Sequence, residues 1–132
     1  MTRINLPPPT FLTDEHLFAE WRELPRVFSL PRDARPTPTT FTLGAGHMRF
    51  FLPFLGWLGR RHAALTAECL ARGYNLTPRP PLPLDGGDWT PTAADIAVSV
   101  ARLREALARS KRPQRFRGVV VGMDFYDSLE CA

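Results

Sequence analysis

Apolar residues recur at helical spacing in three stretches of the sequence, and segments rich in proline and glycine separate these stretches. The first stretch, about residues 14–28, places four large apolar side chains on one stripe: Leu17, Trp21, Leu24 and Phe28. Thr13 precedes it as an N-cap candidate, and Pro25 cannot donate a backbone hydrogen bond to the carbonyl of Trp21. The pattern therefore predicts a capped amphipathic helix whose last turn is bent or irregular.

The same spacing predicts two further helices. The second spans about residues 53–72, ends at Gly73, and carries the apolar stripe Phe54, Leu58, Leu65 and Cys69. The third begins with Thr90 as N-cap and Pro91 in the first turn, and its stripe comprises Ile96, Val100, Leu103 and Leu107. Residues 77–88 hold four prolines and two glycines, so we expect a surface loop there.

Length and composition set the fold class. A chain of 132 residues with 44% apolar content suffices for one packed core, so we expect a single domain covering residues 1–132. Three amphipathic helices must bury their stripes together, which predicts a compact all-α fold with long irregular loops. Cys69 and Cys131 lie far apart in different contexts, so no disulfide framework or four-ligand zinc site is expected from them.

The sequence predicts neither a membrane protein nor an exported one. The most apolar stretch, residues 50–58, is far shorter than a membrane span. Residues 1–12 contain three consecutive prolines and no apolar core of signal-peptide length. We therefore expect a cytoplasmic protein that has no membrane partner.

The charge balance suits a nucleic-acid partner. The net charge is +4, and basic side chains gain affinity by displacing counterions from phosphates. Sixteen of the seventeen basic residues are arginines, which is also typical of a genome rich in G and C, so their distribution is more informative than their number. Residues 102–117 carry seven basic residues against one acid, Glu105, and are a candidate phosphate-binding surface.

The polar face of the first predicted helix holds a cluster with chemical potential. At one hundred degrees per residue, four polar side chains point away from the apolar stripe around the small Ala19: His16, Arg22, Glu23 and Arg26. Spacing alone favours a solvated face, on which Glu23 and Arg26 form an exposed ion pair of little energetic value. The alternative is a functional cluster in which one carboxylate lies among arginines.

Five segments have long and idiosyncratic sequences: residues 1–6 (MTRINL), 16–28 (HLFAEWRELPRVF), 40–51 (TFTLGAGHMRFF), 67–73 (AECLARG) and 99–103 (SVARL). In this order they resemble the pyrimidine-dimer DNA glycosylases of bacteriophage type, the endonuclease V family. Motifs of this length match by chance far less often than a short phosphate-loop pattern. The resemblance implies a base-excision DNA repair enzyme, an N-glycosylase with AP lyase activity on UV-induced cyclobutane pyrimidine dimers in double-stranded DNA.

The resemblance implies that Thr2 is the nucleophile. A small residue after the initiator methionine normally permits removal of Met1, which leaves Thr2 with a free α-amine whose pKa lies near 8. In enzymes similar to this one, that amine attacks the anomeric carbon of the damaged nucleotide, expels the base and forms a Schiff base. The only lysine, Lys111, lies in the basic segment, so few amines compete for the role.

The same resemblance assigns the rest of the site. Glu23 becomes the catalytic carboxylate, which stabilises the sugar cation and transfers a proton during elimination. The DNA-binding residues that it implies are Arg3, His16, Arg22, Arg26 and Arg102. This chemistry needs only an amine and a base, so we expect no metal and no cofactor. His47 and His62 receive no catalytic role; His62 lies beside an apolar stripe and is expected to be a hydrogen-bonded core histidine.

Departures from the family pattern leave the lesion open. The aromatic stretch near the C-terminus is absent, because only Phe116 is aromatic within residues 112–118, and Ala106 stands where the phage enzyme has a basic residue. Three arginines are candidates for electrostatic compensation: Arg104, Arg115 and Arg117. The alternatives are an AP lyase, a glycosylase for another damaged base, a non-catalytic DNA-binding module and, last, a protein-binding helical bundle.

We expect a monomer in the cytoplasm of a bacterial or phage-infected cell, associated with the nucleoid.

Overall fold

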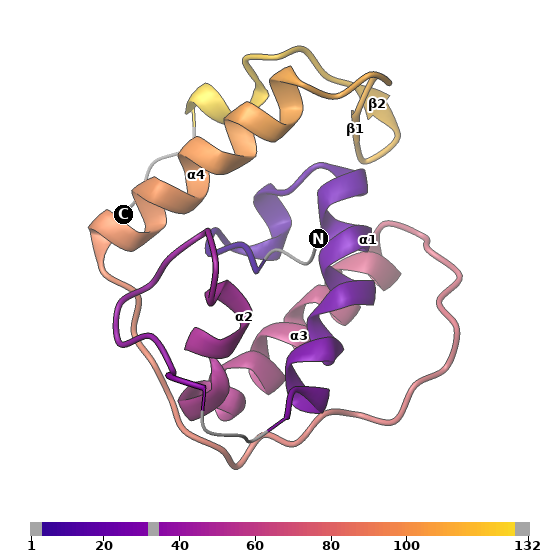
Figure 1. The fold of residues 1–132 in the computed structure, drawn as a ribbon. Coiled ribbons are helices and arrows are strands. Elements are labelled where there is room, and N and C mark those ends of the chain that lie inside the picture. The colour runs from indigo at the N-terminus through magenta and orange to yellow at the C-terminus, as the bar shows by residue number, and fades with distance from the viewer. Residues whose placement is uncertain (1–3, 32–34, 129–132) are drawn as a thin grey trace.

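A computed structural model describes residues 4–31 and 35–128 and shows a predominantly helical fold (Figure 1). The α-helices are α1 (Asp14–Glu23), α2 (His47–Phe50), α3 (Leu55–Ala71) and α4 (Ala93–Ala108), and a small hairpin comprises β1 (Arg115–Phe116) and β2 (Val119–Val120). Short 3-10 helices cover Pro9–Phe11, Leu24–Ser29, Leu52–Phe54 and Phe125–Ser128. The prediction of a predominantly helical fold with three long helices is confirmed, whereas the single turn of α2 and the small two-stranded hairpin depart from the all-α, three-helix prediction.

The first helix begins and ends as its sequence predicts. The Thr13 side chain accepts a hydrogen bond from the His16 N–H at 3.2 Å and so caps α1. The α-helix stops at Glu23 and the chain continues as a 3-10 helix, the irregular last turn expected from Pro25. Leu17, Trp21 and Leu24 are buried, and Phe28 is partly buried against the same core.

The predicted N-cap of the last helix is wrong by two residues. Thr92, not Thr90, precedes α4, and its side chain accepts the Asp95 N–H at 3.1 Å while the Asp95 carboxylate accepts the Thr92 N–H at 3.0 Å. This reciprocal capping box satisfies two backbone donors, which outweighs the preference for proline in a first turn. Of the predicted core stripe, Val100, Leu103 and Leu107 are buried, whereas Ile96 is only partly buried.

The core lies between α1, α3 and α4, and the chain before α1 contributes to it. Its largest fully buried side chains come from separate parts of the sequence and include Ile4, Leu12, Leu17, Phe51, Leu58, Leu65 and Tyr126. Figure 1 shows α1 packed against α3, whereas α4 lies on the other side of the segment that precedes α1. In the described residues no helix combines the length and the apolar character needed to cross a bilayer.

The proline-rich linker is a surface loop, as predicted, and its backbone lies directly on α3. The Trp57 N–H donates to the Gly87 carbonyl at 3.1 Å. A Cβ added to Gly59 would lie 2.1 Å from the Pro83 carbonyl oxygen, and one added to Gly56 would lie 2.1 Å from that of Gly86. Two glycines of the helix therefore make room for the close approach of the loop.

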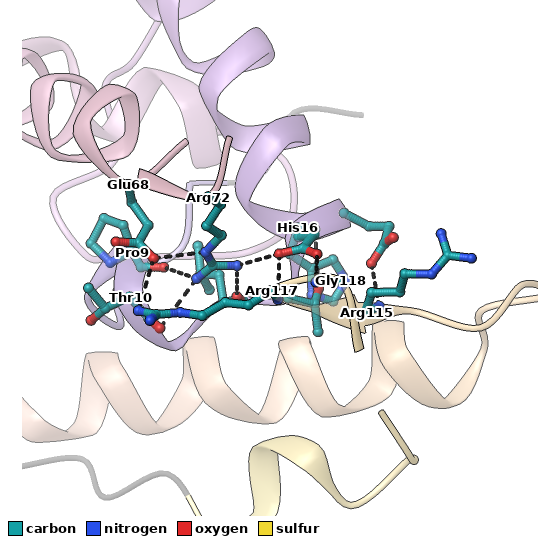
Figure 2. Close-up of polar contacts among 12 residues, drawn as sticks. Pro9, Thr10, His16, Glu68, Arg72, Arg115, Arg117 and Gly118 are labelled. Carbon is teal, nitrogen blue, oxygen red and sulfur yellow. Dashed lines mark hydrogen bonds and ion pairs between the residues drawn. The ribbon is translucent and has the colours of Figure 1, made fainter. Parts of the chain in front are cut away.

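The hairpin after α4 is fastened to the start of α1. Its two-residue turn has positive φ angles at Arg117 (50°) and Gly118 (84°), as a type I′ turn requires. The Asp14 carboxylate accepts the backbone N–H groups of both turn residues, at 3.0 and 2.9 Å, and the Arg72 guanidinium at 2.9 Å (Figure 2). These tertiary bonds hold a left-handed arginine that local sequence alone disfavours.

Candidate active site

The first described residues are fixed by side chains from distant helices. The Ile4 N–H donates to Nε2 of the buried His47 at 2.9 Å, and the His47 Nδ1–H donates to the Thr42 carbonyl at 2.6 Å. The Leu6 N–H donates to Oγ of the buried Ser99 at 3.0 Å. Because Nε2 accepts a hydrogen bond, the His47 imidazole is neutral in this geometry. Helices α2 and α4 thus hold the same extended segment from two directions.

A buried ion pair holds this segment from a third direction. Arg61 of α3 forms a bidentate pair with Glu20 of α1, and both side chains are almost fully buried. The Asn5 amide donates to the same carboxylate at 2.9 Å, and Arg61 donates to the Pro7 carbonyl at 2.9 Å. With its polar atoms satisfied in this way, the pair fixes the segment before α1 to the junction of α1 and α3.

A cleft of about 340 Å³ lies between α1 and α4 and contains three of the predicted site residues. The lining of this α1–α4 cleft comprises Asn5, His16, Ala19, Glu20, Glu23, Arg102, Leu103 and Ala106. His16 and Glu23 come from α1, on either side of the small Ala19, and Arg102 faces them from α4. The fixed N-terminal segment thus enters the cleft that holds the candidate carboxylate.

Glu23 also borders a second hollow, of about 430 Å³, at the C-terminal end of α1. The lining of this arginine hollow comprises Arg22, Glu23, Pro25, Arg26, Ser29 and Arg79. The Glu23 carboxylate lies 2.8 Å from the Arg26 guanidinium and 3.8 Å from that of Arg22. Only 20% of the Glu23 side chain is exposed, against 66% for Arg26, so the cluster is not the fully solvated face favoured by spacing alone.

His16 is held in a closed hydrogen-bond network. Its Nδ1–H donates to the Tyr126 hydroxyl at 2.7 Å, and its Nε2 lies 3.4 Å from the Gln114 amide nitrogen. The Thr13 hydroxyl donates to Gln114 Oε1 at 2.7 Å, which orients the amide so that its N–H faces the imidazole. Burial lowers the pKa of His16 to about 4, although the Glu15 charge opposes this effect. At neutral pH His16 is therefore an uncharged, rigidly oriented wall of the α1–α4 cleft.

The arginines of residues 102–117 do not form one uniform surface. Arg102 lines the α1–α4 cleft, whereas Arg104 pairs with Asp127 at 3.2 Å. Arg117 pairs with Glu68 at 3.4 Å beside the hairpin (Figure 2). If Arg104 and Arg117 bound phosphates in place of the missing basic residue, they would first have to leave these intramolecular ion pairs.

The N-terminal residues and the other two histidines named in the sequence analysis remain to be placed. Thr2 and Arg3 lie outside the described residues. His62 is buried and donates from Nε2 to the Trp21 carbonyl at 2.9 Å, so the expectation of a hydrogen-bonded core histidine is confirmed. Sequence reasoning missed the contribution of His47 to the anchoring of the N-terminal segment; its place in the Gly-Ala-Gly-His motif was the available signal.

The partly buried Glu23 carboxylate borders both the α1–α4 cleft and the arginine hollow. Because guanidinium groups bind phosphates, this site in a helical protein is suited to an anionic, phosphate-bearing substrate. The sequence profile of the family described as pyrimidine dimer DNA glycosylase matches residues 1–80. The chain therefore belongs to the pyrimidine dimer DNA glycosylase family. This membership supports a role as a DNA repair glycosylase. The matched range includes Glu23 and both arginines that flank it.

Proposed function

We propose that this enzyme excises cyclobutane pyrimidine dimers from double-stranded DNA through the α-amine of Thr2 and then cleaves the strand by β-elimination. The observation that carries the proposal is the convergence of the fixed N-terminal segment and the Glu23 carboxylate on one cleft. A bound duplex would present its damaged nucleotide there. We propose that the protein acts as a monomer, because one chain supplies both groups.

Chain geometry supports the choice of nucleophile. Ile4 is held by His47, and Asn5 lines the α1–α4 cleft together with Glu23. Two peptide units span at most about 7 Å between Cα atoms. The Cα atom of Thr2, which carries the α-amine, is therefore within that distance of the Cα atom of Ile4. An α-amine with a pKa near 8 retains a neutral fraction at pH 7, and the neutral form is the nucleophile.

The proposed reaction needs no reactant other than the duplex and water. The amine lone pair attacks C1′ of the damaged nucleotide, the glycosidic bond breaks, and the pyrimidine leaves with the bonding electron pair and gains a proton. The attached amine then loses a proton and its lone pair displaces O4′ from C1′, so the sugar ring opens, O4′ takes up a proton and a protonated imine forms. Removal of a proton from C2′ then expels the 3′ phosphate, and water hydrolyses the imine to regenerate the amine. Glu23 is the proposed base at C2′ and the stabiliser of the developing sugar cation.

The proposed DNA contacts follow from position and charge. Arg22 and Arg26 are exposed at the arginine hollow, and Arg102 lies on the opposite wall of the α1–α4 cleft. Guanidinium groups bind phosphates in a bidentate manner, so these side chains are suited to fix the strand on both sides of Glu23. Arg3 is a fourth proposed phosphate contact. Neutral His16 contributes shape next to the sugar, rather than charge, because both of its ring nitrogens face partners within the protein.

Duplexes that carry one cyclobutane dimer or one abasic site test the proposal, with glycosidic cleavage and strand scission measured separately. Glycosidic cleavage is read as base release after photoreversal of the dimer, because until then the cyclobutane ring joins the excised pyrimidine to its neighbour. The wild-type enzyme is expected to break one glycosidic bond of the dimer and to cut both substrates. Glu23→Gln should lose about 100-fold or more of both activities on the dimer. Glu105→Gln is the matched control, because Glu105 is an exposed carboxylate on the outer surface of α4.

The other outcomes decide between the remaining hypotheses. Strand scission at the abasic site without base release from the dimer would make the protein an AP lyase or a glycosylase for another base. Salt-dependent binding without either reaction would make it a DNA-binding module. Retention of full activity by Glu23→Gln would remove the catalytic role of the carboxylate.

A further inference from the structure

The proline-rich loop carries an arginine into the hollow beside Glu23. The Arg79 guanidinium lies 4.8 Å from the centre of the Trp21 ring and borders the arginine hollow opposite Arg22 and Arg26. We propose that Arg79 is a further phosphate-binding residue, which extends the DNA contact surface from the end of α1 onto residues 77–83. The inference rests on the proposed function, because the ligand is a phosphodiester of the bound duplex.

A rigid platform positions the Arg79 side chain. Trp21 is 4% exposed, its Nε1–H donates to Thr66 Oγ1 at 2.9 Å, and its ring stacks on His62 with centroids 5.8 Å apart. A guanidinium over a fixed indole gains a favourable electrostatic and dispersion contact and loses rotational freedom before any ligand binds. Less ordering entropy then remains to be lost when a phosphate binds.

The loop backbone restricts Arg79 further. Pro78 precedes the arginine, and Pro80 and Pro81 follow it, so three of the four φ angles in this stretch are fixed by rings. Further along, the loop is seated on α3, where the Pro83 carbonyl occupies the space left by Gly59. The arginine is thus presented by a constrained segment rather than by a long flexible loop.

The charge balance of the hollow favours an anionic ligand. Among the described residues of its lining, three carry guanidinium groups and Glu23 is the only acid. Glu23 already pairs with Arg26 and lies near Arg22, while within residues 4–31 and 35–128 no ion pair joins Arg79 to an acidic side chain. Convergence of like charges is unfavourable in the free protein, and a phosphate between them would relieve the repulsion.

The salt dependence of DNA affinity tests the proposal. The probe is a duplex containing a single tetrahydrofuran abasic analogue, which has no leaving base and cannot form an imine, and its binding is followed by fluorescence anisotropy at several salt concentrations. If Arg79 neutralises one phosphate, Arg79→Gln lowers the slope of log K against log salt by about 0.9 and weakens binding at low salt. Arg79→Lys should restore most of the slope, because it restores the charge.

Arg60→Gln is the charge-matched control. Arg60 contacts the same loop through the Leu84 carbonyl and Asp88, but it does not line the arginine hollow and already has an acidic partner. Its substitution removes the same formal charge and should leave the slope close to that of wild type. Thermal melting of each variant reports whether the loop has lost its anchor.

Two results would overturn the inference. If Arg79→Gln weakens binding or lowers the melting temperature while the salt slope stays at the wild-type value, Arg79 only anchors the loop on Trp21. If both glutamine variants lower the slope equally, the effect is one of net charge and not of this hollow. Dimer excision by the wild-type enzyme would leave the proposed function intact in either case, whereas failure of the wild type to bind the duplex would contradict both proposals.

Discussion

At His16, three side chains, two of them from distant parts of the sequence, decide the protonation state of one imidazole. Tyr126 accepts from Nδ1–H, the Gln114 amide faces Nε2, and Thr13 orients that amide. An imidazole that donates from one nitrogen and accepts at the other is neutral. The spacing of α1 placed His16 near Glu23 in sequence analysis, but it did not reveal Gln114 and Tyr126, because they lie about a hundred residues away.

Nuclear magnetic resonance should show a neutral His16 with its proton on Nδ1 at pH 6, because burial lowers its pKa to about 4. Between about pH 6.5 and pH 4 the unfolded chain binds this proton and the folded protein does not, so stability should fall as the pH falls through that window. One pKa unit corresponds to about 1.4 kcal/mol, so the loss due to His16 is at most about 3 kcal/mol.

Denaturant unfolding of wild type and His16→Gln across this range checks the prediction. The variant should lack the part of the pH dependence that His16 contributes, while the part due to His62, whose pKa burial also lowers, should remain in both proteins. A measured pKa of His16 near 6.5, with parallel pH profiles for the two proteins, would show that the network does not exclude the charged form.

At the scale of the elements, local patterns predict helices well and tertiary pairings poorly. The three long helices follow from their apolar stripes, because each must bury one face. The hairpin has strands of only two residues, and its left-handed Arg117 depends on a carboxylate that lies far away in sequence at the start of α1. No local signal in the hairpin predicts this contact.

Asp14→Asn should destabilise the protein by about 3 kcal/mol, because Arg72 would remain buried with one of its anionic partners removed (Figure 2). Burial acts to raise the pKa of Asp14, but the Gly118 N–H, Arg72 and the Arg117 N–H outweigh it and hold the pKa below its usual value. The stabilisation is therefore present at neutral pH and is lost as the pH falls through the lowered pKa.

Chemical denaturation at neutral pH and near pH 3 measures this effect, with the exposed Asp85→Asn as the control that should change stability little. The difference between wild type and Asp14→Asn should shrink at the lower pH. A difference that is independent of pH would assign the cost to packing and not to the charge of the carboxylate.

Gly59→Ala tests whether the loop is seated on α3. Alanine in an open helical position is about 1 kcal/mol better than glycine, but here its Cβ would lie 2.1 Å from the Pro83 carbonyl oxygen. We expect the substitution to destabilise the protein by about 1–3 kcal/mol, because the loop must move away. Urea unfolding measures the change, and a variant as stable as wild type would show that the loop is not packed closely at this position.

At the scale of the whole molecule, the fold gathers groups from both ends of the described chain around one carboxylate. The N-terminal segment, α1 and α4 all contribute to the α1–α4 cleft, and the loop after α3 contributes to the arginine hollow. Sequence reasoning could group His16 and Glu23 because they share a helix face. It could associate Arg102 with them only through family resemblance, since the packing of α4 against α1 is a property of the folded chain.

The identity of the nucleophile is the central claim of this account. Borohydride reduces an imine to a stable secondary amine, so it traps the enzyme covalently on DNA that carries a single cyclobutane dimer. The account predicts an adduct with wild type that begins at Thr2, located by peptide mapping on the N-terminal amine, and an undiminished adduct with Lys111→Arg, which lacks the only lysine. One alanine added before Thr2 should reduce trapping strongly, since it displaces the amine. Loss of the adduct in Lys111→Arg, or base release with no adduct in the wild type, would contradict the account.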